Sequence, residues 1–454
     1  MAPAHRATKW PRARGLANLG LMPRTRAGLG PVERAVLANG LGVVVVPEPA
    51  ATLVGVSVVY NVGFRSEPEG RTGFAHLFEH MMFQRSAHVD KMGHMRTIES
   101  AGGIVNGHTR ADVTAYYEAV PSAALELALY LEADRMAALA LTEENLRNQV
   151  AVVKEEIRRN VLNQPYGGFP WIPLPALAFR TYPNAHNGYG DFSHLEQATV
   201  EDGRDFYKRY YNPANAVLAV VGGCRTEEVV SLAERHFGAI RGRRRPKHGP
   251  WTEPALTSEK HQRVASALVP QPAFAIGYRT PDPVGDLKSF LPYFMLAELL
   301  AVGEASRLRR RLLHQYKNAT DVSASIGTFG DDAFMVRDPT LLRVVVHHPG
   351  QASTEKLLGA VNEEVEALAS EGPRKGELER AVASFASSHW KGLAPLLHRC
   401  HIVGSVETVQ GRAELLSELP DLLAAVAPAQ VTGAAEGILS QHRAVYELVA
   451  ERGK

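Results

Sequence analysis

Cysteine is nearly absent from this sequence of 454 residues, and other features are missing with it. Only Cys224 and Cys400 occur, far apart, which excludes a disulfide framework and a cysteine-based zinc site and favours a reducing cytosol. No apolar run approaches the ~18 residues of a membrane span. The net charge is only +2, so no strong field favours nucleic acid or an anionic membrane. We therefore expect a cytoplasmic globular protein that binds neither nucleic acid nor membrane.

The first part of the chain has basic residues but neither acids nor serine. A transit peptide would be rich in serine, yet no serine occurs before Ser57. A secretory signal needs an apolar stretch of about 7–15 residues, and "GLANLGLM" is too short and too polar. Residues 1–34 are therefore predicted to be a disordered basic tail, with a targeting segment as the alternative.

Beyond this tail, the chain mixes strand and helix patterns, and the second half repeats the alternation more weakly. Val-rich segments at 40–49 and 52–63 predict paired strands, and 102–121 predicts two strands around a turn. Further strands are predicted at 216–223, 272–279 and near 321–346. Helices are predicted at 72–84, 94–100, 122–139, 142–162, 199–210, 288–300, 306–315 and from 353 onward. This mixture predicts an α+β fold.

The best domain boundary is the segment 241–256, which is basic, contains proline and lacks periodicity. We interpret it as a linker rather than as a basic patch for nucleic acid. It divides the chain into an N-terminal domain at 35–240 and a similar C-terminal domain at 257–454.

The stretch "GFAHLFEHMMF" at 73–83 places three ionisable groups in an apolar setting. Because residues four apart share a helix face, His76 and His80 point together, and Glu79 flanks them. Such a pair can hold zinc while the glutamate holds a water against it, in the order H-x-x-E-H. A hydrogen-bonded cluster of histidine and glutamate without a metal is the alternative.

The remaining positions of this helix indicate a cleft beside the histidines. One stripe is apolar, and the histidines fall on the opposite side together with Phe83, so that side is no charged solvent face. The apolar stripe consists of Phe74, Leu77, Phe78 and Met81. Ionisable groups buried without a partner are costly, and a metal would remove that cost.

A catalytic zinc needs a third protein ligand, which we expect from the helix at 142–162, with Thr142 as its N-cap. Its apolar stripe is Leu146, Val150, Val153 and Ile157. Glu155 lies nearly opposite this stripe, toward solvent. Glu156 lies on its flank, so Glu156 is the acid able to reach a buried ion.

These segments resemble the pitrilysin/insulinase family of zinc metallopeptidases, in particular its short, two-domain branch. The resemblance rests on "VGFRSEPEGRTGFAHLFEHMMFQRS", "ESAGGIVNGHTRADVTAYYEAVP", "VVKEEIRR" and "YKRYYNPANAVLAVVGG". It implies a zinc endopeptidase whose two domains form half of a clam shell. His76, His80 and Glu156 would be the zinc ligands, and Glu79 would be the general base.

The resemblance also implies that the substrate adds a β-strand along the edge at 102–109, where Asn106 and Gly107 would hold the peptide backbone. A plain hairpin turn at Asn106-Gly107 is the alternative, because Asn-Gly is a strong turn signal. The aromatic loop at 163–195 would either line the peptide chamber or pack against a sheet. The residues concerned are Phe169, Trp171, His186 and Tyr189.

Two departures from the family pattern bear on activity. Gln149 stands where relatives often have a glutamate, seven residues before the third ligand. Leu313 and Thr320 stand where an Arg and a Tyr would stabilise the oxyanion. We therefore expect the catalytic half of a heterodimer whose partner supplies that pair.

Two alternatives to the heterodimer stay open. One is a non-catalytic scaffold or peptide-binding subunit. The other is a stand-alone homodimeric peptidase in which Arg310, Arg311 or Tyr316 replaces the missing pair. The peptide itself, a leader or a general oligopeptide, is not specified by these residues.

Overall fold

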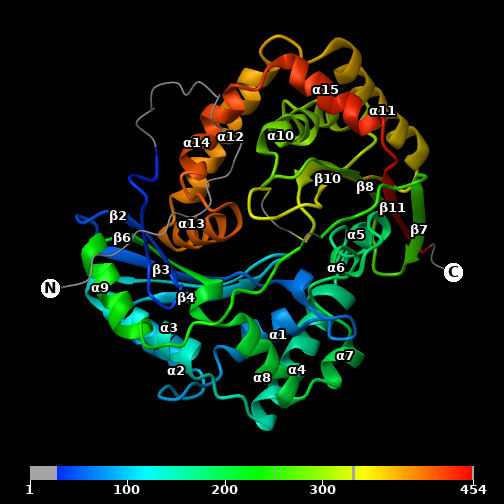
Figure 1. Ribbon diagram of the computed structural model, residues 1–454. Coiled ribbons are helices and arrows are strands. Elements are labelled where there is room, and N and C mark those ends of the chain that lie inside the picture. Colours follow the sequence, from blue (N-terminus) through cyan, green and yellow to red (C-terminus); the bar gives the residue numbers. More distant parts are fainter. Residues whose placement is uncertain (1–27, 250, 330–332, 452–454) are drawn as a thin grey trace. The chain divides into compact units, whose positions relative to one another are not determined.

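The computed structural model describes residues 28–249, 251–329 and 333–451, which form two compact units (Figure 1). The first unit comprises residues 28–153, 188–248 and 390–418, and the second comprises the described residues of 154–187, 249–389 and 419–451. Each unit is therefore discontinuous in sequence. The expected domains 35–240 and 257–454 are contiguous, whereas segment 154–187 groups with the second unit and segment 390–418 with the first.

A six-stranded mixed sheet forms the first unit, in the order β1-β2-β6-β3-β5-β4. Its strands are β1 Glu33–Val36, β2 Gly42–Pro47, β3 Leu53–Tyr60, β4 Ile104–Thr109, β5 Thr114–Pro121 and β6 Ala216–Gly222. The central strands β3 and β6 are almost wholly buried, as expected for Val-rich runs covered on both faces. Because only β5 pairs with it, β4 lies at an edge of the sheet.

Helices cover both faces of this sheet. The helices from the N-terminal half of the sequence are α1 Phe74–Met81, α2 Gly93–Ser100, α3 Leu125–Ala137, α4 Glu143–Ile157, α7 Phe192–Glu196, α8 Val200–Tyr210 and α9 Thr226–Phe237. Helix α13, Leu396–Gln410, packs against β3, β5 and β6 on the face opposite α1, α3 and α9 (Figure 1). The core between α1, α3, α9 and the sheet includes Phe78, Tyr60 and Leu129.

Two expectations about this unit need correction. The strands at 40–49 and 52–63 are not paired, because β6 lies between β2 and β3. The predicted tail is ordered at its end: Leu29 is buried, and Arg34 in β1 bonds Glu407 and Glu414. The rest of that tail, residues 1–27, lies outside the described residues.

The second unit contains a five-stranded sheet in the order β7-β11-β8-β10-β9. Its strands are β7 Lys260–Ser266, β8 Ala273–Arg279, β9 Asp321–Ile326, β10 Leu341–His347 and β11 Ala444–Ala450. Its helical segments include α5 Pro173–Ala178, α6 Tyr182–Ala185, α10 Leu287–Ala301, the π-helix Arg309–Gln315, α11 Thr354–Glu371 and α15 Pro428–Leu439. Helices α12 Glu377–Leu393 and α14 Leu415–Ala424 each cross the division between the units. As in the first sheet, one parallel pair, β7–β11, lies next to antiparallel neighbours.

The Pro-rich segment after α4 belongs largely to this second core. Phe169, Leu174 and Phe179 are buried against Ala273, Leu341 and their neighbours. The packing alternative therefore holds for Phe169, because this residue is only 4% exposed.

No single helix among the described residues has the length and apolar character to cross a membrane. Helices α14 and α15 meet those criteria only together, as a pair bent by 96°.

Candidate metal centre

Helix α1 carries the His-Glu-His motif and is held firmly at its start. Gly73, at φ 86°, begins the helix without a capping side chain of its own. The buried Glu67 carboxylate instead accepts hydrogen bonds from the Gly73 and Ala75 amides, at 2.9 and 2.8 Å. A negative charge at a helix N-terminus is favourable because the first amides lack intrahelical partners. The predicted apolar stripe from Phe74 to Met81 is buried, which confirms the orientation of the helix.

The two histidines of α1 lie side by side. Their ring centroids are 4.9 Å apart, and His76 is 8% exposed. Tyr189 packs its ring 5.7 Å from that of His76. This contact depends on glycine, because a Cβ at Gly190 would lie 2.5 Å from the Gly73 Cα. Tyr189 therefore lies at the candidate site, unlike Phe169 of the same loop region.

The third candidate ligand is on α4. Thr142 accepts a hydrogen bond from the Asn145 amide at 3.2 Å, as expected of an N-cap. Val153 and Ile157 are buried, so Glu155 is exposed, where it pairs with Arg158. Glu156 is half-buried, and ligand atoms of His76, His80 and Glu156 lie within 4.8 Å of one another.

Two imidazoles and one carboxylate are a donor set suited to zinc, which prefers nitrogen and oxygen ligands in tetrahedral sites. Such a set leaves one coordination position for water or substrate. The separation of the donor atoms is compatible with one ion between them. The residues present therefore fit the metal that the resemblance implies.

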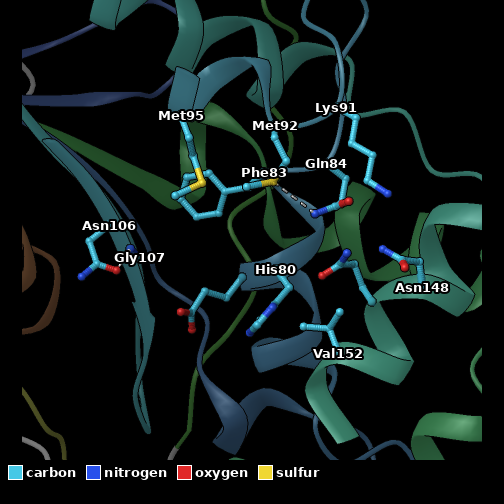
Figure 2. A pocket seen from close by; sticks show the side chains of 12 residues that line it. His80, Phe83, Gln84, Lys91, Met92, Met95, Asn106, Gly107, Asn148 and Val152 are labelled. Atoms are coloured by element: carbon cyan, nitrogen blue, oxygen red, sulfur yellow. Dashed lines mark hydrogen bonds between the residues drawn. The ribbon is translucent and has the colours of Figure 1, made fainter. Parts of the chain in front are cut away.

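A pocket of about 430 Å³ opens beside these ligands (Figure 2). Glu79 and His80 from α1 line it together with Phe83 just after that helix, and α4 contributes Asn148, Gln149 and Val152. Gln149, which stands where an acid was expected, is buried at 4% exposure. The predicted cleft on the histidine side of α1 is thus present.

Asn106 and Gly107 also line this pocket, in the middle of β4. They do not form a hairpin turn, because the chain reverses after Thr109. The Arg110 amide donates a hydrogen bond to the Val113 carbonyl, on the β5 side of the strand. Because successive amides of a strand point to opposite sides, the amides of Val105 and Gly107 point away from β5, to the open edge. The Asn106 side chain accepts the Gly107 amide at 2.8 Å.

Gly107 also lies close to α1 and to Phe83 just after it. A Cβ there would meet the Phe83 ring at 3.2 Å and the Glu79 Cγ at 3.4 Å. Glycine therefore leaves room above Glu79 for another backbone to lie along β4.

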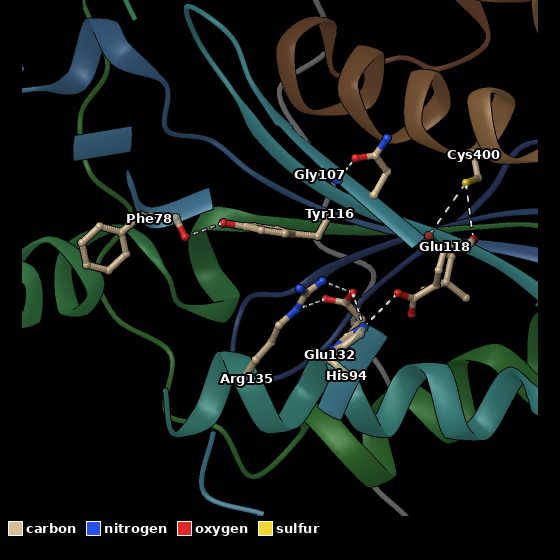
Figure 3. A network of polar contacts seen from close by, with 10 residues as sticks. Phe78, His94, Gly107, Tyr116, Glu118, Glu132, Arg135 and Cys400 are labelled. Carbon is tan, nitrogen blue, oxygen red and sulfur yellow. Dashed lines mark hydrogen bonds and ion pairs between the residues drawn. The ribbon is translucent and has the colours of Figure 1, made fainter. Parts of the chain in front are cut away.

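Behind the pocket lies a buried polar network that the sequence pattern did not indicate (Figure 3). Arg135 makes a bidentate ion pair with Glu132, and its guanidinium stacks 4.3 Å from the Tyr116 ring and 5.0 Å from that of Phe83. His94 Nε2 lies 3.1 Å from the Glu118 carboxylate. The i,i+3 spacing of Glu132 and Arg135 is compatible with an ion pair on one helix face. Nothing in that spacing indicates that Glu118 of β5 lies beside them.

Burial sets the protonation of this network. It raises the pKa of Glu118 and that of Glu132 to about 7, although the charge of Arg135 acts in the opposite direction. It lowers the pKa of His94 to about 3, with the nearby Arg135 contributing. His94 is therefore neutral at pH 7. The network also reaches α1, because the Tyr116 hydroxyl donates to the Phe78 carbonyl at 3.2 Å.

The segment of the second half that lacks the expected Arg/Tyr pair forms the π-helix Arg309–Gln315 and is not helical from Tyr316 to Thr320. Arg311 is engaged by Glu363 and Glu364, and its guanidinium lies 5.4 Å from the Tyr316 ring. Arg310 and Tyr316 are exposed. Thr320 donates to the Gln271 side chain at 3.1 Å. Arg311 is thus already neutralised by two carboxylates.

Two sequence profiles match this chain. "Insulinase (Peptidase family M16)" covers residues 43–166, and "Peptidase M16 inactive domain" covers residues 197–385. The chain belongs to the insulinase family of peptidases. The predicted α+β fold class is likewise confirmed.

Relatives of this family member include zinc proteases. The zinc protease PqqE of Helicobacter pylori is 28% identical over 311 residues, which are 67% of this chain and 69% of that protein. The probable mitochondrial-processing peptidase subunit beta of Schizosaccharomyces pombe is 28% identical over 213 residues, 46% of this chain and 45% of that protein. These names indicate that zinc is used in the family.

Solved structures show the same fold. A protease from Helicobacter pylori has a TM-score of 0.83 at 23% identity and covers 92% of this chain and 99% of that one. The periplasmic protease PqqL of Escherichia coli has a TM-score of 0.75 at 17% identity, with 94% of this chain but 48% of that one covered. The match therefore spans about half of the length of PqqL.

Proposed function

We propose that this chain is the catalytic half of a zinc-dependent endopeptidase. His76, His80 and Glu156 would hold the metal, and Glu79 would be the general base. The observation that carries the proposal is the convergence of these three donor groups within 4.8 Å, beside a pocket that Glu79 lines.

Each residue has a separate task in this proposal. Zinc, when bound, would supply a Lewis acid and lower the pKa of a bound water. Glu79 would accept the proton of that water, since it lies one helix position before a ligand and faces the pocket. The open amides of Val105 and Gly107 would pair with an extended peptide, and Asn106 would release the Gly107 amide to it.

A second subunit would complete the site. The half-length match to PqqL and the similarity to a processing-peptidase subunit support a pairing of two halves. The engagement of Arg311 by two carboxylates disfavours the homodimer alternative that uses this residue. The partner would supply groups for the oxyanion, and a cytosolic location belongs to the same proposal.

A non-catalytic scaffold is the second candidate. The observation behind it is the match of residues 197–385 to a profile described as an inactive domain. Loss of activity with every second subunit, despite bound zinc, would favour this candidate.

Zinc content of the purified chain tests the proposal. We expect about one zinc per chain at the candidate centre in the wild type and a large loss in Glu156→Ala, because a ligand is removed. Glu155→Ala is the matched control, since that acid is exposed and paired with Arg158. Equal zinc contents in the two variants would overturn the assignment of Glu156.

A further inference from the structure

Three histidines gather on the face of the first sheet that α13 covers. His108 lies on β4, whereas His398 and His401 lie one turn apart on α13. The Nε2 atoms of His108 and His401 are 3.2 Å apart, and their ring centroids 4.3 Å. The His398 ring lies 5.5 Å from that of His401.

This cluster is separate from the candidate metal centre. Successive side chains of a strand point to opposite faces, so His108 lies on the other face of β4 from the Cβ position of Gly107, which faces Glu79. Tyr117, the partner of Asn106 in β5, stacks on His401 at 4.6 Å. The aromatic contact fixes the His401 ring with its Nε2 toward His108.

We propose that His108, His401 and His398 form a second binding site for a divalent transition metal such as Zn²⁺. Two nitrogen ligands at the usual Zn–N distance are separated by about 3.3 Å in a tetrahedral site, close to the observed Nε2 separation. Imidazole ligands suit zinc, nickel and copper. His398 is exposed, so it can move to the ion, and water can complete the coordination.

The protonation of the pair agrees with this site. Burial, and then the other histidines and Arg110, lower the pKa of His108 and lower that of His401 to about 3. Both imidazoles are therefore neutral at pH 7, as metal ligation requires. The positive charge of Arg110 also opposes a bound cation, so we expect binding in the micromolar range rather than the nanomolar range.

A metal here would link segments that are distant in sequence. His108 and His401 are 293 positions apart, and α13 belongs to the first unit although it follows most of the second unit in sequence. An ion bound to the folded state alone would stabilise this docking and raise the midpoint of thermal unfolding.

A zinc titration of a chain without the first centre tests the proposal. In His76→Ala/His80→Ala, we expect calorimetry with zinc chloride to show one site, and the unfolding midpoint to rise with zinc. Adding His401→Ala should abolish both effects. Adding His398→Ala, at an exposed position, should weaken binding about tenfold or more without affecting the fold.

His442→Ala in the same background is the control, because this histidine is exposed on the second unit. The proposal would be overturned if the double variant bound no zinc at 100 times the concentration that saturates the wild-type centre. It would also be overturned if His401→Ala left the binding unchanged. The His108–His401 contact would then be only a hydrogen bond between neutral imidazoles. Because these readouts use a chain without the first centre, they do not depend on peptidase activity.

Discussion

The two sheets repeat one topology but differ in what the topology positions. The orders β6-β3-β5-β4 and β11-β8-β10-β9 correspond strand for strand, and in each a helix follows the central strand before the edge strand is reached. In the first sheet this helix is α1, with His76, Glu79 and His80. In the second it is α10, which contains no histidine and buries leucine and phenylalanine instead.

This difference indicates that the fold does not require the polar helix. The apolar helix α10 occupies the same position in the second sheet. Its one acid is Glu298, and burial raises the pKa of this carboxyl to about 7. The chemistry of the first unit therefore rests on a few substitutions in one helix, together with α4. If that comparison is correct, changes to α1 should affect activity far more than equivalent changes to α10.

The largest effect is expected for Glu79→Gln. Removing a general base costs roughly 10²- to 10⁴-fold, and the amide keeps the shape of the side chain, so zinc should remain bound while cleavage nearly disappears. The measurement is hydrolysis of a quenched fluorescent peptide by the active assembly, together with metal analysis. Glu298→Gln in α10 is the matched control and should leave cleavage unchanged. More than a tenth of wild-type activity in Glu79→Gln would contradict its assigned role.

Buried charge also distinguishes the halves. Arg135→Met would leave the fully buried Glu132 without its guanidinium, which should lower the free energy of unfolding by roughly 3–5 kcal/mol. Arg311→Met in the second half removes two partly exposed pairs and should cost ~1 kcal/mol or less. Urea unfolding of both variants measures the difference. Similar losses would mean that the Arg135 network is not the special feature of the first half.

Much of the candidate centre could be predicted from sequence because its signals are local. The spacing of His76 and His80, the apolar stripe of α1 and the flank position of Glu156 all follow from helical periodicity. What could not be predicted depends on pairing over long distances. Nothing local placed β6 between β2 and β3, or returned α13 to the first sheet, and so the pairing of His108 with His401 was not visible.

Strands without a Val-rich or alternating pattern were not predicted either. β7 and β11 pair in parallel although most of the C-terminal part of the sequence separates them. Neither strand has the Val-rich run that indicated β2 and β3. The network of His94, Glu118 and Glu132 was missed for a related reason: charged residues normally predict an exposed position. Only the compensating contacts between different elements make their burial possible.

A smaller effect is expected where β4 approaches α1. Gly107→Ala would place a Cβ 3.2 Å from Phe83 and 3.4 Å from Glu79, so the strand edge or the pocket wall must shift by a few tenths of an ångström. We expect kcat/KM to fall about tenfold, since a displacement of this size disturbs the alignment of a bound strand. Gly359→Ala on α11, where a Cβ would meet nothing within 4 Å, is the control and should not affect cleavage. An unchanged kcat/KM in Gly107→Ala would mean that the substrate does not bind along this edge of β4.

The last effect concerns the pH dependence of stability and the buried carboxyl of Glu118. Because its pKa is raised to about 7, the folded chain retains a proton that the unfolded chain releases above about pH 4.5. This group therefore costs stability as pH rises toward 7, whereas Gln does not titrate. The stability of Glu118→Gln relative to the wild type should increase between pH 5 and pH 8, by on the order of 2 kcal/mol.

His94 acts in the opposite direction, since its pKa is lowered, but it is present in both proteins and cancels in the difference. Urea unfolding at several pH values gives that difference directly. Glu298→Gln is the counterpart in the second half and should show the same sign, because burial raises the pKa of that carboxyl too. A stability difference for Glu118→Gln that is flat with pH would mean that Arg135 keeps the Glu118 carboxylate ionised, and that the two halves differ more in charge than burial alone predicts.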